Sequence, residues 1–427
     1  MPTQVDIKIT ALGGRGDGIG EVSGESVYVP FALPGETVLA TLTGNRARVD
    51  EITKPSPDRI EPICPHFTRC GGCAVQHLDL EAYRSWKKGI VETALANRGL
   101  DAPVEELVDG HGEGRRRVTL HVRFHKGRVL AGFMQARSHA LLDLDKCPVL
   151  VPALSGAADV ARSLAAPFKG LGQPLDVSFT ATESGLDCDI RLAKAPKELD
   201  MDARMDIADM ATNLDLARVT VGGDIVVERR PPVIHMGAGR IVPAPGGFLQ
   251  ATQAGEEVLA GLVMDHAQGA GKIADLFCGV GPFTLRLAAE SSVLAADNDE
   301  EQIAALGQAV RHCQGLKPIT PEVRDLFENP YRSEELSDFD CVVFDPPRVG
   351  AQAQARELAA SRVSSVIGVS CNPASFARDA AVLCDGGFRL ERVIPVDQFK
   401  YTRHVELVAN FRRCSIILPA ARPRSAR

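Results

Sequence analysis

The sequence predicts an α/β protein of more than one domain, whose C-terminal part forms a doubly wound, mostly parallel sheet. From about residue 245 onward, short apolar strands alternate with helical stretches, which is the pattern of such a sheet. Upstream, short β patterns separated by glycine-rich turns indicate a small barrel and then a mixed α+β segment. The chain has 427 residues, which is too long for a single hydrophobic core.

The composition is that of an ordinary globular protein, with 45% apolar and 24% charged residues. No apolar run reaches the ~18 residues that a membrane span needs, and the N-terminus lacks the apolar stretch of a signal peptide. We therefore expect a cytoplasmic protein with no membrane partner. The net charge of −7 argues against a protein that is basic all over, but local basic patches still allow nucleic acid to bind.

The first expected domain covers residues 1–57. Residues 5–53 contain the β patterns VDIKIT, SVYVP, TVLATL and ARVDEI, separated by turns such as GGRGDGIG. Their even spacing favours a barrel of the OB type, which can be structural or can bind oligonucleotides. The proline-rich segment KPSPDRIEPICP then reads as an extended linker.

The second expected domain covers residues 58–245. The segment LEAYRSWKKGIVETALANRG predicts a helix that ends near Gly99. Residues 115–235 combine the strand patterns RVTLHVRFH, RVLAGFM, LDVSFTAT and LDCDIRL with at least one helix. We expect an antiparallel sheet here, and this stretch carries no catalytic signature.

Three of the eleven cysteines, Cys64, Cys70 and Cys73, lie close together in the sequence. In a cytosolic chain, cysteines are expected as thiols, metal ligands or nucleophiles rather than disulfides. Three clustered thiolates need a fourth ligand to hold a tetrahedral zinc ion or a four-iron cluster. The spacing alone does not choose between these metals.

The third expected domain, residues 246–427, begins its sheet with KIADLF and a turn that contains Gly279 and Gly281. Glycines there let the backbone approach a ligand at a helix N-terminus. Thr284 occupies the place of a third glycine, which weakens a dinucleotide fingerprint. Acids follow successive strand ends, namely Asp297, Asp325 and Asp345. Because these ends face one crevice, the acids favour a nucleoside cofactor whose ribose hydroxyls they can bind.

Cys371 follows the strand pattern SVIGVS and precedes Asn372-Pro373 and a predicted helix. The thiol is therefore expected at the cofactor end of the sheet, near a helix N-terminus that would lower its pKa. A lone cysteine is more often a buried core residue. Its position beside the cofactor nevertheless indicates a nucleophile.

Four segments, DLFCGVGPFTL, VVFDPPR, SCNPASFARD and TRHVE, occur in this order in the C-terminal part. Together they resemble the uracil-5 RNA methyltransferase family, and further matches extend along the whole chain. The resemblance implies a class I methyltransferase domain with S-adenosylmethionine as its cofactor. It also implies that the cofactor site is lined by Gln250, Phe277, Asp297, Asp325 and Asp345. The chain departs from some members at Pro282, where they carry Asn.

The implied reaction is methylation of carbon-5 of a uridine in RNA. Carbon-5 of uracil is a poor nucleophile, so the site needs a thiolate that adds to carbon-6 and a base that later removes the carbon-5 proton. By resemblance, Cys371 is the nucleophile and Glu406 is the base. The loop before Glu406 departs from the family at Phe399-Lys400-Tyr401.

Two other classes of methyltransferase share parts of this pattern. Amino-group enzymes carry Asn-Pro-Pro-Tyr where this chain has Asp345-Pro346-Pro347-Arg348, and they need no cysteine nucleophile. Arg348 lacks the aromatic ring that would stack on the base. Cytosine-5 enzymes place their cysteine in a Pro-Cys setting, whereas Cys371 precedes Asn-Pro.

The segment CPHFTRCGGCAVQH, with Cys-Pro-Val-Leu at 147–150, resembles the iron–sulfur subset of the family. This implies a [4Fe-4S] cluster on Cys64, Cys70, Cys73 and Cys147 in a central α+β domain. A radical enzyme is not expected, because Cys-x3-Cys-x2-Cys is absent. Residues 1–57 resemble the TRAM barrel, which favours RNA binding. The barrel and the cysteines together favour ribosomal RNA, with transfer RNA as the alternative.

An alternative hypothesis, from a different class of protein, is a non-catalytic iron–sulfur or RNA-binding protein with a decayed methyltransferase domain. The presence of both Cys371 and Glu406 argues against decay. No obligate protein partner is evident. Between residues 115 and 128 the chain carries Arg115, Arg116, Arg117, Arg123, Lys126 and Arg128. We predict that these cations, the first three above all, hold single-stranded or loop RNA by its phosphates.

Overall fold

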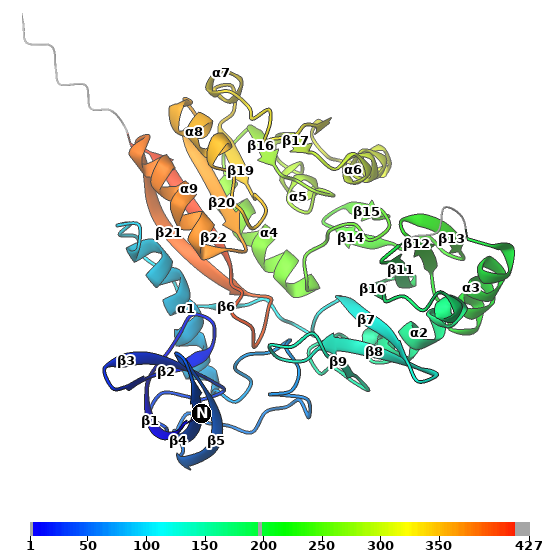
Figure 1. Ribbon diagram of the computed structural model, residues 1–427. Coiled ribbons are helices and arrows are strands. Elements are labelled where there is room, and N and C mark those ends of the chain that lie inside the picture. The colour runs from blue at the N-terminus through cyan, green and yellow to red at the C-terminus, as the bar shows by residue number, and fades with distance from the viewer. Residues whose placement is uncertain (1–2, 195–198, 415–427) are drawn as a thin grey trace, which may run out of the picture.

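The computed structural model describes residues 3–194 and 199–414. Figure 1 shows three β assemblies along the chain: an N-terminal barrel, a central sheet with helices, and a C-terminal sheet between helices. Three arginines near the C-terminus, Arg422, Arg424 and Arg427, lie outside the described residues. Within those residues, no helix is long and apolar enough to cross a lipid bilayer.

The N-terminal strands close into a barrel with the order β1-β2-β3-β5-β4, as the sequence predicts. The strands are β1 Thr3–Leu12, β2 Asp17–Val22, β3 Glu25–Pro30, β4 Thr37–Thr43 and β5 Arg46–Lys54. One expectation was wrong, because GGRGDGIG is not only a turn: its second half begins β2. A Cβ on Gly20 would lie 2.4 Å from Cγ2 of Ile7, so glycine is what allows β2 to pack so closely inside the barrel.

The central sheet has seven strands in the order β13-β12-β11-β10-β7-β8-β9. Its strands are β7 Arg117–His125, β8 Arg128–Met134, β9 Leu141–Asp143, β10 Leu175–Thr182, β11 Gly185–Leu192, β12 Arg218–Val221 and β13 Asp224–Glu228. The expected antiparallel pairing is wrong for one pair, because β11 and β12 run parallel. Helix α3, Met201–Asn213, connects them, and such a crossover returns the chain in the same direction.

Two helices and two short 3-10 segments cover the central sheet. They are η1 Pro152–Leu154, α2 Ala157–Leu164, η2 Ala166–Leu171 and α3. Their apolar side chains pack with Val122, Val177 and Ile190 of the sheet into one core. A two-stranded sheet, β14 Ile234–Met236 and β15 Gly239–Ile241, then precedes the C-terminal part.

The C-terminal sheet has eight strands in the order β18-β17-β16-β19-β20-β22-β21-β6. The strands are β6 Val108–Asp109, β16 Lys272–Leu276, β17 Ser292–Asp297, β18 Ile319–Val323, β19 Cys341–Phe344, β20 Ser365–Ser370, β21 Phe388–Asp397 and β22 Glu406–Arg413. The five strands from β18 to β20 are parallel, and β22 is antiparallel to its two neighbours. The predicted strands at β16, β17, β19 and β20 are thus confirmed.

Helices cover both faces of this sheet. They are α4 Gln253–Ala267, α5 Thr284–Leu287, α6 Glu300–His312, α7 Ser333–Leu336, α8 Gln352–Ala360 and α9 Pro373–Asp385. Val342 and Val366 face the core that contains α8 and α9, whereas their neighbours Val343 and Ile367 face the core that contains α4. Adjacent strand residues point to opposite faces, so this arrangement explains why the strands are apolar throughout.

Two elements from the first quarter of the chain join the C-terminal sheet. Helix α1, Leu80–Ala96, begins at the N-cap Asp79, and its side chains Val91 and Leu95 lie in the same core as α8 and α9. Strand β6 pairs in parallel with β21 at the sheet edge. The division of the chain at residues 57 and 245 stays a prediction.

Candidate functional site

The glycine turn after β16 holds three residues in the left-handed region. They are Phe277 (φ 65°), Gly279 (φ 54°) and Gly281 (φ 85°). A Cβ on Gly281 would lie 2.6 Å from Cδ1 of Leu306, so the turn requires glycine there. The Gly279 N–H donates to Oδ2 of Asp297 at 2.9 Å, which ties the turn to the end of β17. The turn and this acid are thus brought together as the sequence predicts.

The remaining predicted cofactor residues lie at the same edge of the sheet. Asp345 directly follows β19, and its N–H donates to the carbonyl of Leu276 at 3.2 Å. Asp325 lies two residues beyond β18 and accepts from the N–H of Phe327 at 2.9 Å. Among the described residues, no hydrogen bond joins Asp325 to the other predicted cofactor residues. The Phe277 ring lies 5.5 Å from that of Phe327.

Carboxyl groups without a countercharge gather at this edge. Burial raises the pKa of Asp345 well above its usual range, and Glu406, Asp275 and Asp297 add to the shift. Burial likewise raises the pKa of Asp275 to about 7, although Thr284 donates to it at 2.6 Å. Its other oxygen is buried and has no hydrogen-bond partner. Such an edge can stabilise a bound cation.

Cys371 lies between β20 and α9, as predicted. Asn372 caps α9 by accepting from the N–H of Ala374 at 3.1 Å, and its Nδ2 donates to the Arg348 carbonyl at 2.9 Å. The expected lowering of the thiol pKa is wrong. Burial, together with the carboxylates of Glu406 and Asp345, raises the pKa of Cys371 to about 11.

Glu406 is the first residue of β22 and is 5% exposed. Burial raises its pKa to about 7, and a hydrogen bond from Gln398 opposes this shift. That bond, from Nε2 of Gln398 to Oε1 of Glu406, is 2.9 Å long. The same Nε2 lies 2.8 Å from Oε1 of Gln250, so Gln250 contacts the predicted base site rather than the glycine turn. A carboxyl with a pKa near 7 can act as a general base near neutral pH.

Arg348 provides the positive charge beside these groups. It lowers the pKa values of both Cys371 and Glu406, against the larger effect of burial. Its Nη2 lies 2.8 Å from Nδ1 of His404. Burial lowers the pKa of His404 to about 4, with Arg348 adding to the effect, so the imidazole is neutral near pH 7 and can accept this bond.

A groove of about 740 Å³ opens on Cys371. One wall is the turn between β1 and β2 with Arg15, and another is α1 with Trp86, whose Nε1 donates to the Gly13 carbonyl at 3.0 Å. The third wall carries Arg348, Arg403 and His404. No acid lines the groove, and within the described residues none of its arginines has an ion-pair partner.

The four predicted metal ligands line a second cavity, of about 400 Å³, together with Arg115. Burial raises the pKa of Cys73 to about 12 and that of Cys147 to about 11. The Gln76 Nε2 donates to Sγ of Cys73 at 3.2 Å, and the N–H of Gly72 donates to Sγ of Cys70 at 3.4 Å. The Nε of Arg115 is buried without a partner. The four thiols therefore share this cavity with the guanidinium of Arg115.

This arrangement does not by itself support the metal assignment. Across residues 3–194 and 199–414, no group of three or more His, Cys, Asp or Glu side chains is arranged to hold a metal ion. The structure shows the four cysteines only as lining one cavity.

The predicted RNA-binding role of the arginines at 115–117 is wrong, because their side chains are used inside the protein. Arg116 is 6% exposed and forms an ion pair with Glu256, which also pairs with Arg286 at 3.0 Å. Arg117 donates to the Leu249 carbonyl at 2.7 Å. The guanidinium of Arg115 lies 5.3 Å from the ring of Phe399. These contacts join the central segment to the C-terminal part.

Known proteins share this sequence over nearly its whole length. An uncharacterized RNA methyltransferase of Brucella suis is 44% identical, and the match covers 94% of this chain and 96% of that protein. A 23S rRNA (uracil(1939)-C(5))-methyltransferase of Chromohalobacter salexigens is 32% identical over 94% of this chain and 87% of its own. This chain belongs to the RNA (uracil-5-)-methyltransferase family.

Two further likenesses agree with membership of the RNA (uracil-5-)-methyltransferase family. The family model described as tRNA (Uracil-5-)-methyltransferase matches residues 323–413, which include Cys371 and Glu406. The crystal structure of Pyrococcus abyssi tRNA (uracil-54, C5)-methyltransferase in complex with S-adenosyl-L-homocysteine superposes with a TM-score of 0.71. It is 23% identical and covers 96% of this chain and 100% of that one, which shows a common fold.

Within this family site, sequence reasoning missed Gln398, Lys87 and the Thr284–Asp275 pair. Gln398 follows the buried end of β21 and is 0% exposed, so a polar residue directly after an apolar strand was the available signal. Lys87 lies in a helix that carries several charges, and nothing in its neighbours marks it as buried.

Proposed function

We propose that this protein methylates carbon-5 of a uridine in RNA with S-adenosylmethionine, in the cytoplasm. The observation that carries the proposal is that Cys371, Glu406, Asp345 and Arg348 meet at the edge of the sheet that also bears the glycine turn. A nucleophile and a base with a pKa near 7 therefore lie beside a place for a nucleoside.

The chain's own groups account for the proposed chemistry. The Cys371 thiolate adds to carbon-6 of uracil, which makes carbon-5 nucleophilic. Carbon-5 would then take the methyl group as the methyl–sulfur bond of the sulfonium breaks, and Glu406 takes the proton from carbon-5. As that proton leaves, the sulfur–carbon-6 bond breaks and frees the thiolate. Arg348 stabilises the thiolate form of Cys371, because its charge opposes the effect of burial.

The residues present fit the proposed cofactor. S-adenosylmethionine supplies a methyl group on a positively charged sulfonium, and among the described residues no cation forms an ion pair with Asp275, Asp297 or Asp345. The turn at Gly279 and Gly281 leaves room for a nucleoside close to the backbone. Asp297 is the acid placed to bind ribose hydroxyls, and Phe277 lies beside it.

The groove that opens on Cys371 is proposed as the path of the RNA, in place of the arginines at 115–117. Changing Arg15 and Arg403 together to Ala should weaken RNA binding and reduce its salt slope by roughly 1.4, since each phosphate contact on a single strand contributes ~0.7. The matched control changes Arg311 and Arg356, which are exposed on α6 and α8 and do not line the groove. Filter binding at several salt concentrations measures the RNA affinity and the salt slope of both double variants. An equal salt slope of RNA binding in the two double variants would contradict the groove as the path of the RNA.

Ribosomal RNA is the proposed substrate class, supported by the 32% identical relative that acts on 23S rRNA. The name of the family model favours transfer RNA as the second candidate. Mass spectrometry of purified ribosomal and transfer RNA, from cells with and without the protein, tests both. If both RNA fractions keep their 5-methyluridine in cells without the protein, the proposed function is contradicted.

A [4Fe-4S] cluster on Cys64, Cys70, Cys73 and Cys147 is proposed on the basis of their shared cavity and the charge of Arg115. A cluster spreads its four ligands over several irons, so it fits thiols around a cavity better than a single ion does. Changing Cys147 to Ser should remove iron and visible absorption from anaerobically purified protein. Cys313→Ser, at the end of α6, is the control and should retain both. Protein with stoichiometric zinc and no iron would contradict the cluster.

A further inference from the structure

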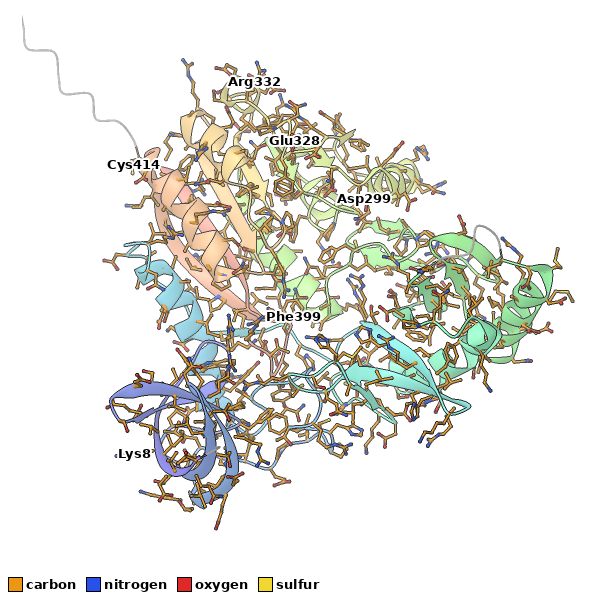
Figure 2. All side chains as sticks on the ribbon, in the orientation of Figure 1. Lys8, Asp299, Glu328, Arg332, Phe399 and Cys414 are labelled. Carbon is orange, nitrogen blue, oxygen red and sulfur yellow. The ribbon has the colours of Figure 1, made fainter. Side chains whose placement is uncertain are left out.

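A lysine is completely buried where α1 meets the loop between β21 and β22. Lys87 is 0% exposed, and the loop it contacts, residues 398–405, leads directly into Glu406. Figure 2 labels Phe399 in this loop, at the end of the C-terminal sheet that faces the barrel and the central sheet. The two segments are far apart in the sequence, since Lys87 and Asp397 are separated by 310 positions.

The Lys87 ammonium uses all of its donors on this loop and on Asp397, the last residue of β21. Its Nζ donates to Oδ1 of Asp397 at 3.1 Å, to the carbonyl of Phe399 at 3.3 Å and to the carbonyl of His404. An ammonium has three N–H donors, and these are the three acceptors. A neutral amine would leave one of the oxygens without a donor.

Tyr83 completes the attachment from the same face of α1, one helical turn earlier. Its hydroxyl donates to the other carboxylate oxygen of Asp397 at 2.6 Å and accepts from the N–H of Tyr401 at 2.9 Å. Tyr83 is 2% exposed and Asp397 3%. Two side chains of α1 thus bind the end of β21 at Asp397 and the loop at Phe399, Tyr401 and His404.

The attached loop carries the groups that face the reacting atoms. His404 contacts Arg348, which lies beside Cys371, and Glu406 follows His404 by two residues. At the other end, Gln398 donates to Glu406 and follows Asp397 directly. A shift of the loop would therefore move both the carboxylate and the charge that acts on the thiol.

We propose that Lys87 is a positioning residue for uracil-5 methylation, holding the loop 398–405 so that Glu406 and the Arg348–His404 pair face Cys371. The inference rests on the proposed function. A buried ion pair rarely stabilises a protein more than apolar side chains of the same volume would. Packing α1 against the sheet therefore does not need an ammonium, whereas fixing two carbonyls and one carboxylate at set positions does.

The test compares Lys87→Met and Tyr83→Phe with Lys88→Met in the full chain. Lys88 is the adjacent residue and pairs at the surface with Glu106, so its variant removes the same charge without touching the loop. Lys87→Met should lower kcat by about 10²-fold, the order expected when a reacting group is displaced by about 1 Å. The KM for S-adenosylmethionine should not change. Hydrogen exchange in residues 398–405 should be faster, with β20 and α9 unaffected.

The outcomes separate this inference from the proposed function. If Lys87→Met does not fold, Tyr83→Phe decides, because it keeps the ring and removes only the two hydrogen bonds; it should show the same changes to a smaller extent. Folded variants with unchanged exchange in the loop, or with faster exchange and an unchanged kcat, would overturn the inference. A wild-type protein without methylation activity would overturn the proposed function, and hydrogen exchange would still report whether Lys87 holds the loop.

Discussion

Changing Cys371 to Ala should abolish methylation and leave S-adenosylmethionine binding intact. The thiol is the only proposed group that forms a bond to uracil, so its loss should lower turnover by about four orders of magnitude or more. Among the described residues, no hydrogen bond joins Cys371 to the glycine turn or to Asp297, which bond each other instead, so the cofactor affinity should persist. A tritiated-methyl assay and calorimetry measure the two quantities.

Cys313→Ala is the matched control for this variant, because its thiol contacts the carbonyl of Ala238 and does not line the groove that opens on Cys371. It should retain full activity. Turnover of Cys371→Ala within tenfold of the control would show that the nucleophile is another residue. Loss of cofactor binding in Cys371→Ala would instead show that the substitution disturbs the turn between β20 and α9.

Changing Glu406 to Gln should allow methyl transfer but stop the release of RNA. Glutamine keeps the size of the side chain and the contact with Gln398, and it cannot accept the carbon-5 proton. The covalent bond between Cys371 and carbon-6 should therefore persist after the methyl group has moved. A denaturing gel should show a protein–RNA band that accumulates with time. Normal turnover without this band would remove Glu406 from the mechanism.

The pKa of Glu406 also predicts how RNA release depends on pH. Burial raises this pKa to about 7, so the carboxyl is protonated below that pH and cannot act as a base. In the wild type, the rate of release should rise as the pH increases toward 7 and level off above it. A pulse–chase measurement isolates release from thiolate formation, which has a pH dependence of its own because the pKa of Cys371 is raised to about 11.

Local patterns sufficed to predict where the glycine turn, the acids after β17 and β19 and Cys371 lie, whereas their roles stay predictions. The turn at Gly279 and Gly281, the acids after β17 and β19, and Cys371 after β20 are all placed by short segments whose geometry follows from strand and turn chemistry. The alternation of strands and helices then brings these segments to one edge, because parallel strands end on the same side.

Features that depend on distant contacts could not be predicted. Arg116 and Arg117 stand in a run of cations that is typical of a solvated or RNA-binding face, yet Glu256 and a backbone carbonyl from more than 130 positions away make them interior residues. The prediction that the pKa of Cys371 is lowered was wrong for the same reason. The helix that begins after Cys371 can be predicted from the adjacent sequence. The carboxylates of Glu406 and Asp345, which lie near the thiol, belong to other parts of the sheet and cannot be predicted in this way.

The attachment of α1 and β6 to the C-terminal sheet has a consequence for the order of folding during translation. Val91 and Leu95 of α1 belong to a core that otherwise consists of residues from Ala274 onward, and β6 pairs with β21. These early segments leave the ribosome long before their partners, so they wait in the nascent chain with apolar side chains exposed. A fragment that starts at residue 246 would expose the matching surface of α9 and the edge of β21. Chaperone contact should therefore concentrate on Leu80–Ala96 until the last strands have been synthesised.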